Sequence, residues 1–506
     1  LFLFLYLLIF IISIKENEAS NATIAYRSNT TGGTDTPKIR EWNSTGDGSF
    51  NGEVILSNSS SALRYMQLKY SPISSKRILV TLSEDGNLDA YVCRRFCNSS
   101  SSWVLSPNIG NVWSAAADQR RFDVEFESRT GDAIVIYSNV STDPSTDLAY
   151  RILPADNDTF TSGMIEEKLN DVVTTDVQYS WVEIARNPRT DSEEMIIVGF
   201  DSTGNDINAW VWNGTNFTNN VEPSAASTAT SSRKALSVAY AGNTSSCSNC
   251  TVGIIVAGTG TTGSVNGRLW TGSAWITADP GDMASGNDDI QWLQLKSSPL
   301  NSNGKVFLYS QESGSDIQIA IWNGANWTLE NVTDTTVDSL TSIIGDVAWN
   351  STDNGGFLMW ETDGAGENLY QDYCTFPDSK DYKCTLQLKN ITNGTGTSGR
   401  YNGTGAWLSL YTNPSPDNVV DVLGLRLNSN FDLFLLAKNT TNTSLYSNGT
   451  ALTVNAGSIT QWPYALDFAR VEENPPQKIN LSNPLNGTSN ETPTHDFRVN
   501  ATDNVN

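Results

Sequence analysis

The sequence predicts an all-β protein built as a β-propeller, and three observations support this prediction. A turn flanked by aromatic residues occurs three times, at residues 212–218, 270–275 and 322–328. A unit of strand-like segments recurs along most of the chain, and no long segment after residue 14 shows the periodicity of a helix. Repetition of one small unit is the sequence signature of an array in which each unit packs against its neighbours.

The recurring turn has the chemistry of a tight hairpin. Two copies place Asn-Gly at their centre, in Trp212-Asn213-Gly214 and Trp322-Asn323-Gly324. A type I′ turn needs positive φ at both central residues, which asparagine and glycine tolerate. Each turn is therefore expected to join two antiparallel strands.

Each unit contains four expected strands. The first alternates apolar and polar residues, the second is continuously apolar, and the third follows a polar turn that often ends in aspartate. The first strands lie about 53 to 63 residues apart and are expected at residues 65–70, 122–126, 181–185, 236–240, 291–295, 345–349, 406–411 and 464–469. Four antiparallel strands per unit indicate a propeller blade, whereas β-sandwich domains need about 100 residues each.

The ends of the propeller, expected over residues 37–473, suggest how the ring closes. Seven units have all four strands, while 464–469 is a first strand alone and 38–43 is an isolated third strand. Pairing both chain ends in one split blade would remove exposed strand edges. This gives eight blades, and seven blades with decorations is the alternative.

The flanking segments have other compositions. Residues 1–19 are predicted to be a signal peptide or a clipped signal-anchor, because residues 1–14 are almost entirely apolar. Residues 20–36 are expected to be a flexible polar segment. A linker follows at 474–477, with Pro475-Pro476, and residues 478–506 are expected to begin a second, truncated domain.

The Trp-Asn-Gly blades, followed by Pro-Pro-x-x-Ile-x-Leu and the segment Phe497 to Asn504, resemble secreted archaeal surface proteins. In that family a β-propeller precedes immunoglobulin-like repeats. The resemblance implies that 478–506 starts an Ig-like β-sandwich and that the protein is displayed at the cell surface. It implies no reaction.

Charge limits the classes of partner. The net charge is −24 and no Lys/Arg run exceeds two residues, so the basic footprint of a nucleic-acid binder is missing. Membrane attachment is expected only through the N-terminal apolar segment or a C-terminal anchor beyond this sequence. Surface glycans and other cell-surface proteins remain as partners.

Cysteines and glycosylation sequons indicate an extracellular protein. The six cysteines form three local pairs, expected as the disulfides Cys93–Cys97, Cys247–Cys250 and Cys374–Cys384, although the CxxC spacing of 247–250 also occurs in zinc sites. About two dozen Asn-x-Ser/Thr sequons occur. The glycosylation candidates are Asn43, Asn58, Asn98, Asn139, Asn213, Asn243, Asn326, Asn350, Asn402 and Asn448.

The sequence offers little for catalysis or for a cofactor. The one histidine, His495, lies in the C-terminal tail, so a His-dependent triad is excluded from the propeller. An aspartate recurs before the third strand of successive units, and Ca²⁺ binding competes there with a structural turn role. These weak Ca²⁺ candidates are Asp89, Asp147, Asp206, Asp316 and Asp432.

The preferred interpretation is therefore a non-catalytic, exported structural or adhesion module. The first alternative is a glycan-binding lectin-like propeller, which predicts exposed Trp or Tyr beside carboxylates on one loop face. The second is a glycosidase or lyase, which predicts two facing carboxylates in a deep groove.

Overall fold

The computed structural model describes most of the repeat region. It covers residues 21–468 apart from 29–34, 44–48, 58, 60, 113–118, 140–146, 161–166, 170–177, 203, 225–232, 243–250, 260–262, 284–287, 300–303, 315, 333–342, 352–354, 363–367, 376–382, 391–405, 415–421, 428–432, 439–450 and 454–463. The predicted signal segment, the linker and the Ig-like domain lie outside the described residues. Among the described residues no helix is long and apolar enough to span a membrane.

The described strands form eight antiparallel sheets, which we number as blades 1 to 8. Blade 1 contains β34 (Tyr464–Phe468), β1 (Asn21–Ser28), β2 (Thr36–Asn43), β3 (Ser49–Phe50) and β4 (Val54–Ile55). Blade 2 contains β5 (Leu63–Tyr70), β6 (Arg77–Ser83), β7 (Asn87–Cys93) and β8 (Val104–Asn111), with the short 3₁₀ helix η1 (Ser100–Ser102) before β8. Blade 3 contains β9 (Phe122–Phe126), β10 (Ala133–Ser138), β11 (Leu148–Leu153) and β12 (Glu167–Leu169).

The next three blades follow the same order from first to last strand. Blade 4 contains β13 (Tyr179–Arg186), β14 (Glu194–Asp201), β15 (Asp206–Asn213) and β16 (Phe217–Ser224). Blade 5 contains β17 (Leu236–Ala241), β18 (Val252–Gly258), β19 (Ser264–Trp270), β20 (Trp275–Thr277) and β21 (Gly281–Asp282). Blade 6 contains β22 (Ile290–Ser297), β23 (Val306–Glu312), β24 (Ile317–Trp322) and β25 (Trp327–Val332).

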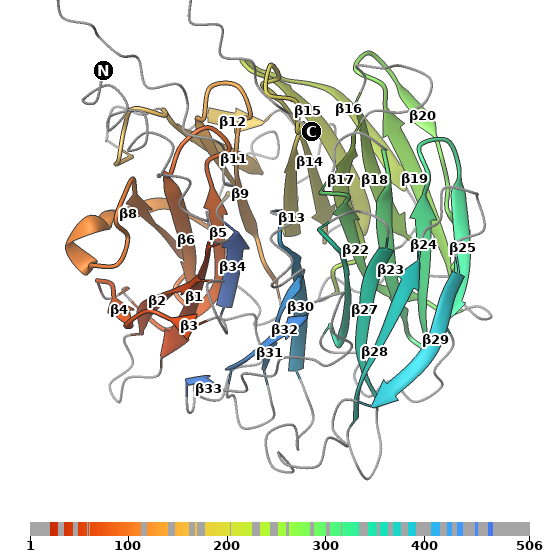
Figure 1. Ribbon diagram of the computed structural model, residues 1–506. Coiled ribbons are helices and arrows are strands. Elements are labelled where there is room, and N and C mark those ends of the chain that lie inside the picture. Colours follow the sequence, from red (N-terminus) through yellow and green to blue (C-terminus); the bar gives the residue numbers. More distant parts are fainter. Residues whose placement is uncertain are drawn as a thin grey trace, which may run out of the picture.

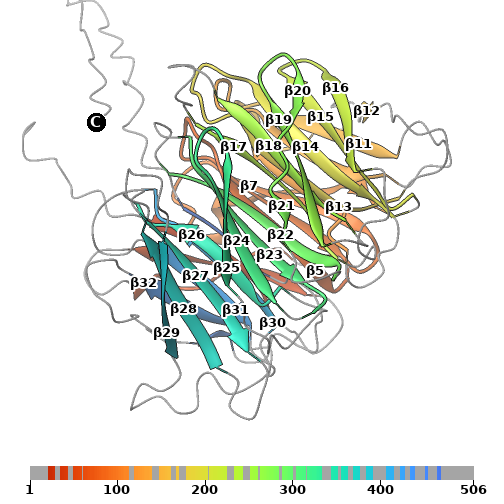
Figure 2. The ribbon, with the colours of Figure 1, turned by 90° about the vertical axis from the view of Figure 1, so that its right-hand side faces the viewer.

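The last two blades complete the ring. Blade 7 contains β26 (Gly345–Trp349), β27 (Gly355–Thr362), β28 (Asn368–Thr375) and β29 (Lys383–Asn390). Blade 8 contains β30 (Ala406–Thr412), β31 (Val422–Leu427), β32 (Leu433–Lys438) and β33 (Ala451–Thr453). The first strands contact one another in the closed order β34, β5, β9, β13, β17, β22, β26, β30 and back to β34. Figures 1 and 2 show the blades from two directions. The predicted propeller is confirmed, with eight blades.

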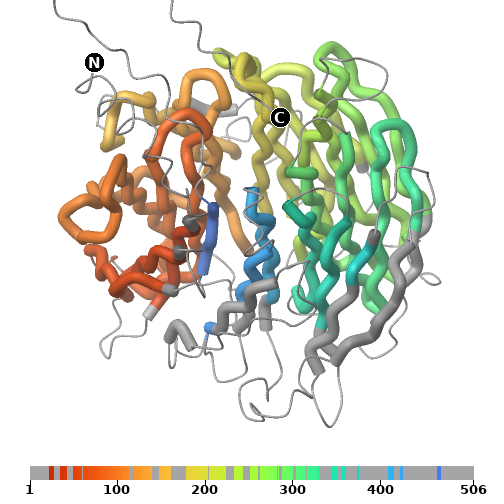
Figure 3. Tube along the Cα trace, viewed as in Figure 1, coloured from red at the N-terminus to blue at the C-terminus, as the bar shows by residue number. Residues whose placement is uncertain are grey.

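Blade 1 is split between the chain ends, as predicted, but it also contains an unexpected strand. β34 pairs antiparallel with β1, and β1 pairs with β2, so the first and last described strands lie side by side (Figure 3). The expectation that residues 20–36 form a flexible polar segment is wrong for β1. Pairing on both edges gives the backbone N–H and C=O groups of β1 hydrogen-bond partners. The side chains of Ile24 and Tyr26 are also buried, so this segment is an inner strand of the blade.

The blades associate in four pairs, which are 1 with 2, 3 with 4, 5 with 6, and 7 with 8. Four of the five apolar clusters each lie mainly between the two blades of one pair. The even-numbered members share a sequence pattern at their first strand, visible at 63–72, 179–188, 290–299 and 405–414, where each segment ends in proline. The structural repeat is therefore two blades long.

A polar side chain of the first strand joins the blades of each pair. In blades 1, 3 and 7 a carboxylate oxygen accepts the backbone N–H of the next blade's first strand. These bonds run from Tyr70 to Asp467 at 2.9 Å, from Ile184 to Asp123 at 3.0 Å and from Leu410 to Asp346 at 2.8 Å. In blade 5 the Ser237 hydroxyl accepts the Leu295 N–H at 3.0 Å.

Aromatic side chains close one end of the central channel. Tyr65, Trp181 and Trp292 come from blades 2, 4 and 6 and are fully buried. Trp181 packs edge-on against Tyr65 at 6.1 Å between ring centroids and against Trp292 at 5.6 Å. We call this group the aromatic plug.

Truncation of the plug is expected to destabilise the whole ring. Trp181→Ala should lower the free energy of unfolding by about 3–5 kcal/mol, because it leaves a cavity where three blades meet. Ile55→Ala, at a side chain that is 54% exposed, should change it by less than about 0.5 kcal/mol. Urea unfolding monitored by tryptophan fluorescence and circular dichroism compares the two variants, and equal effects would contradict the plug's role.

Candidate functional site

The central channel opens at the end opposite the aromatic plug, where it widens into a cavity of about 340 Å³. Its wall is built by the carboxyl ends of the first strands and the turns that follow them. Successive side chains of a strand alternate in direction, so the side that bears Trp181 also bears Glu183 and faces the channel. The charged and aromatic residues that line this channel cavity are Lys69, Glu125, Glu183, Arg186, Tyr240, Lys296, Tyr411, Asp467 and Phe468.

A smaller cavity of about 150 Å³ continues the channel toward the plug. It shares Lys69, Glu183, Lys296 and Tyr411 with the channel cavity. It also shares Gln294, and its additional polar wall comes from Gln67, Arg120, Asp123, Lys234 and Ser409. The site is therefore a blind, polar funnel.

Each cation around the funnel has a carboxylate partner. The nitrogen–oxygen distances are 2.9 Å for Lys69–Glu125, 3.4 Å for Arg186–Glu125, 2.8 Å for Lys234–Glu183, 3.5 Å for Arg120–Asp123 and 3.3 Å for Lys296–Asp346. Because the charges are matched, the funnel presents donors and acceptors without a dominant sign.

Two side chains extend this network to the aromatic wall. The Lys296 ammonium lies 5.5 Å from the centroid of the half-buried Tyr411 ring. It also donates to the Leu410 carbonyl at 3.2 Å. A ring beside a fixed ammonium gives the funnel an apolar face next to a hydrogen-bond donor.

The carboxylates of the site titrate differently. Burial acts to raise the pKa of Glu125, but the charges of Lys69 and Arg186 outweigh burial and hold this pKa below its ordinary value of 4.5. At Asp346 burial raises the pKa despite the opposing charge of Lys296. At Asp467 burial likewise raises the pKa, against the charge of Lys69. Burial therefore prevails at Asp346 and Asp467, whereas neighbouring charge prevails at Glu125.

The five aspartates suggested by the sequence do not gather in this funnel. Asp147, Asp206 and Asp316 precede or open third strands on three different blades, and a carboxylate oxygen of Asp89 accepts the Asn108 N–H at 2.9 Å. Asp432 lies outside the described residues. No group of three or more acidic, His or Cys side chains that could hold a metal ion occurs in the described part of the chain.

The structure describes the three predicted disulfides to different extents. Cys93 and Cys97 are bonded to each other. Cys374 is also disulfide-bonded, and it lies opposite Cys384 in the β28–β29 ladder. Cys247 and Cys250 are outside the described part of the chain.

Two glycosylation candidates are wrong for the folded protein. Asn139 is 8% exposed and Asn350 is 1% exposed, and the Asn350 amide donates to the Tyr373 hydroxyl at 3.0 Å, so neither side chain has room for a glycan. Asn98, Asn213 and Asn326 are exposed. The side chains that the structure does not describe are Asn43, Asn58, Asn243, Asn402 and Asn448.

The funnel residues were not singled out from the sequence, although a signal exists. The first strands were identified by alternation, and their polar positions, such as Lys69, Glu125 and Glu183, are the ones that face the channel. In a propeller the first strand of each blade lines the axis. Reading the polar face of these strands would have located the site.

Comparison with known proteins supports the fold and identifies no family. No family model and no curated protein sequence matches the chain. The structure is similar to the BP39L lectin from Burkholderia pseudomallei, with a TM-score of 0.50, 9% sequence identity and coverage of 77% of this chain and 99% of that chain. It also matches the six-bladed Aleuria aurantia lectin, with a TM-score of 0.35, 13% identity and coverage of 63% and 94%. These identities are low, so the likeness concerns the fold alone.

The Glu125 ion pairs are expected to make stability depend on pH. The pKa of Glu125 is lower in the folded chain than its ordinary value of 4.5, so its stabilisation is present above pH 4.5 and is lost as pH falls through the folded pKa. Glu125→Gln should therefore lower the melting temperature at neutral pH and have a smaller effect well below pH 4.5. Melting curves of both proteins across this range, by circular dichroism, test this expectation. A difference in melting temperature that stays the same at every pH would show that the pairs contribute nothing.

Proposed function

We propose that this chain is an exported, cell-surface glycan-binding protein that uses the channel cavity as its saccharide site. One observation carries the proposal, namely that the half-buried Tyr411 ring lies beside charge-paired donors and acceptors at the open end of a blind channel. A saccharide ring has an apolar face and many hydroxyl groups that both donate and accept hydrogen bonds. The size of the cavity, about 340 Å³, suits one small polar ligand.

The matched charges favour a neutral sugar over a strongly charged ligand. An ion entering the funnel would have to displace an existing ion pair, and breaking a buried pair is costly. Hydroxyl groups can instead share the Arg186 and Lys296 donors and the Glu125 and Glu183 acceptors. The similarity in fold to lectins is consistent with this proposal.

The proposal includes binding without hydrolysis. Glu125 contacts Lys69 and Arg186, and Glu183 contacts Lys234, so both carboxylates are held in ion pairs. A general acid in a glycosidase instead needs a proton available at working pH. Release of reducing ends from a polysaccharide panel would contradict this part of the proposal.

Export and display at the cell surface complete the proposal. They rest on the apolar N-terminal segment, the sequons and the paired cysteines. The bonded Cys93–Cys97 pair supports an oxidising compartment, because disulfides persist there. Detection of N-glycans on Asn98, Asn213 or Asn326 by mass spectrometry of the native protein tests it.

The saccharide site is tested by binding. A glycan array with the recombinant protein, followed by calorimetry on the best ligand, should give affinities that fall about tenfold or more in Tyr411→Ala and Arg186→Ala, because each removes a contact surface of the cavity. The expected binding needs no Ca²⁺, because the four candidate aspartates that the structure describes lie on separate blades.

Arg189→Ala is the matched control. Arg189 follows the same strand as Arg186, but its ion pair with Asp191 lies outside the channel cavity, at 2.7 Å. This variant should bind like the wild type. Arg189 also lines a separate hollow of about 240 Å³ with Glu194 of blade 4 and Thr271 of blade 5. Loss of binding in Arg189→Ala alone would move the site to that hollow, and uniform absence of binding would overturn the proposed function.

A further inference from the structure

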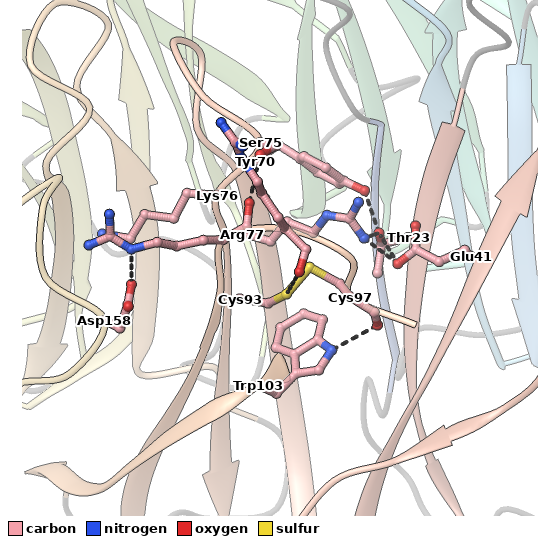
Figure 4. The surroundings of a disulfide bond; sticks show 12 residues. Thr23, Glu41, Tyr70, Ser75, Lys76, Arg77, Cys93, Cys97, Trp103 and Asp158 are labelled. Carbon is pink, nitrogen blue, oxygen red and sulfur yellow. Dashed lines mark hydrogen bonds and ion pairs between the residues drawn. A yellow bond between two sulfur atoms is a disulfide. The ribbon is translucent and has the colours of Figure 1, made fainter. Parts of the chain in front are cut away.

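The turn between β7 and β8 projects from blade 2 as a small covalent ring. We call residues 93–97, Cys-Arg-Arg-Phe-Cys, the finger. The Cys93–Cys97 disulfide closes it, the Trp103 indole donates to the Cys97 carbonyl at 3.0 Å, and the Arg94 guanidinium pairs with Asp158 of blade 3 (Figure 4). Trp103 and Cys97 are buried, so the base of the finger is fixed.

The tip of the finger is a strained and exposed phenylalanine. Phe96 is 81% exposed, the highest value among the large hydrophobic side chains described, and its φ is +53°. Glycine or asparagine adopts this left-handed conformation more easily, and a bulky residue there is an outlier. Within one chain the Phe96 side chain gains nothing that offsets this strain, which points to a contact outside the chain.

Arg95 gives the tip a positive charge. It is exposed and makes no ion pair with any residue that the structure describes. The whole chain has a net charge of −24, so the finger is a basic, apolar point on an acidic molecule. Aromatic and arginine side chains together are typical of the centres of protein interfaces.

A complementary surface lies at the outer edge between blades 5 and 6. The Trp275 indole donates to Asn219 of blade 4, so Ile276, the next residue of β20, faces blade 6 instead. The Trp327 indole donates to Ala278 of blade 5, so Leu329, two residues along β25, faces blade 5. Ile276 is 48% exposed and Leu329 is 39% exposed. We call this pair with Asp279 the socket.

Asp279 offers the negatively charged partner that Arg95 lacks among the described residues. Asp279 follows Ile276 by three residues. Its side chain is 42% exposed, and its carboxylate lies 3.3 Å from the Arg268 guanidinium. Its Oδ1 accepts both the Gly267 N–H, at 2.7 Å, and the Arg268 guanidinium, so among the described contacts Oδ2 is left to face another cation. The socket is therefore apolar and acidic, where the finger is apolar and basic.

We propose that copies of this chain associate head to tail, with Phe96 of one copy seated between Ile276 and Leu329 of the next, and Arg95 beside Asp279. The finger lies just before β8, and Leu329 of the socket lies on β25. Figure 1 shows β8 and β25 on opposite sides of the ring. A contact between unlike surfaces on opposite sides extends into an open row and does not close as a dimer. A second copy is favoured over another partner because both complementary halves are present on this chain.

Sedimentation velocity of the full chain over a concentration series tests the proposal. The wild type should form dimers and longer species as concentration rises. Phe96→Asn, which keeps a residue suited to positive φ, and Leu329→Ser should each weaken association about tenfold or more. High salt should weaken the wild type as well, because the Arg95 contact is screened.

Mixing the two variants separates this arrangement from a symmetric one. Phe96→Asn keeps an intact socket and Leu329→Ser keeps an intact finger, so an equimolar mixture should form 1:1 dimers that grow no further. The control is Ile55→Ser, whose exposed aliphatic side chain lies on β4 outside both surfaces; it should associate like the wild type.

Three outcomes would overturn the head-to-tail contact. They are a monomeric wild type at every concentration, an equal loss in Ile55→Ser, and a mixture that stays monomeric. If the finger binds a different protein and not a second copy of this chain, the wild type will stay monomeric at every concentration, which is the first of these outcomes. None of these results depends on glycan binding, so they leave the proposed saccharide site untouched.

Discussion

Each blade pair depends on a hydrogen bond from the first strand of one blade to a polar side chain of the preceding blade. Apolar packing between sheets is non-directional, so by itself it does not fix how far one blade is shifted along the channel axis relative to the next. Asp123 and Asp346 are buried carboxylates, and a buried carboxylate without partners is costly. Their bonds to Ile184 and Leu410 therefore fix the height of neighbouring first strands. Asp467 does the same between blades 1 and 2 through Tyr70.

That constraint also builds the funnel. Once the first strands of a pair are fixed in position along the channel axis, side chains two residues apart on each strand form layers across the channel. The layer at the closed end contains the aromatic plug. The layers nearer the open end contain Glu125, Glu183 and the lysines that pair with them. The matched charges inside contrast with the net charge of −24 for the whole chain. The acidity of the protein thus belongs to its surface and does not describe its site.

Local signals allowed much of the fold to be predicted. The hairpin at Trp212 and the lone first strand near Tyr464 depend on turn residues and alternation, which a short window contains. The type I′ geometry expected for that hairpin is wrong, because the loop spans residues 213–216 and of Asn213 and Gly214 only Gly214 has positive φ. β1 escaped prediction because its short, polar sequence becomes a strand through pairing with β34 at the other end of the chain. Asn139 and Asn350 were misjudged because burial of a sequon is a tertiary property. The pairing of blades was missed because each single blade already looked like the repeat.

The sequence by itself determined the class of the fold and the position of the turns, since these follow from residue periodicity and backbone preference. It favoured eight blades over seven, and the closed ring of eight sheets settled that number. The tertiary structure alone decided which polar residues meet in the channel and which apolar residues stay exposed. Lys69 and Glu125 belong to different blades, as do Ile276 and Leu329. Contacts between blades depend on strand height and facing direction, which ring closure sets and no local stretch of sequence encodes.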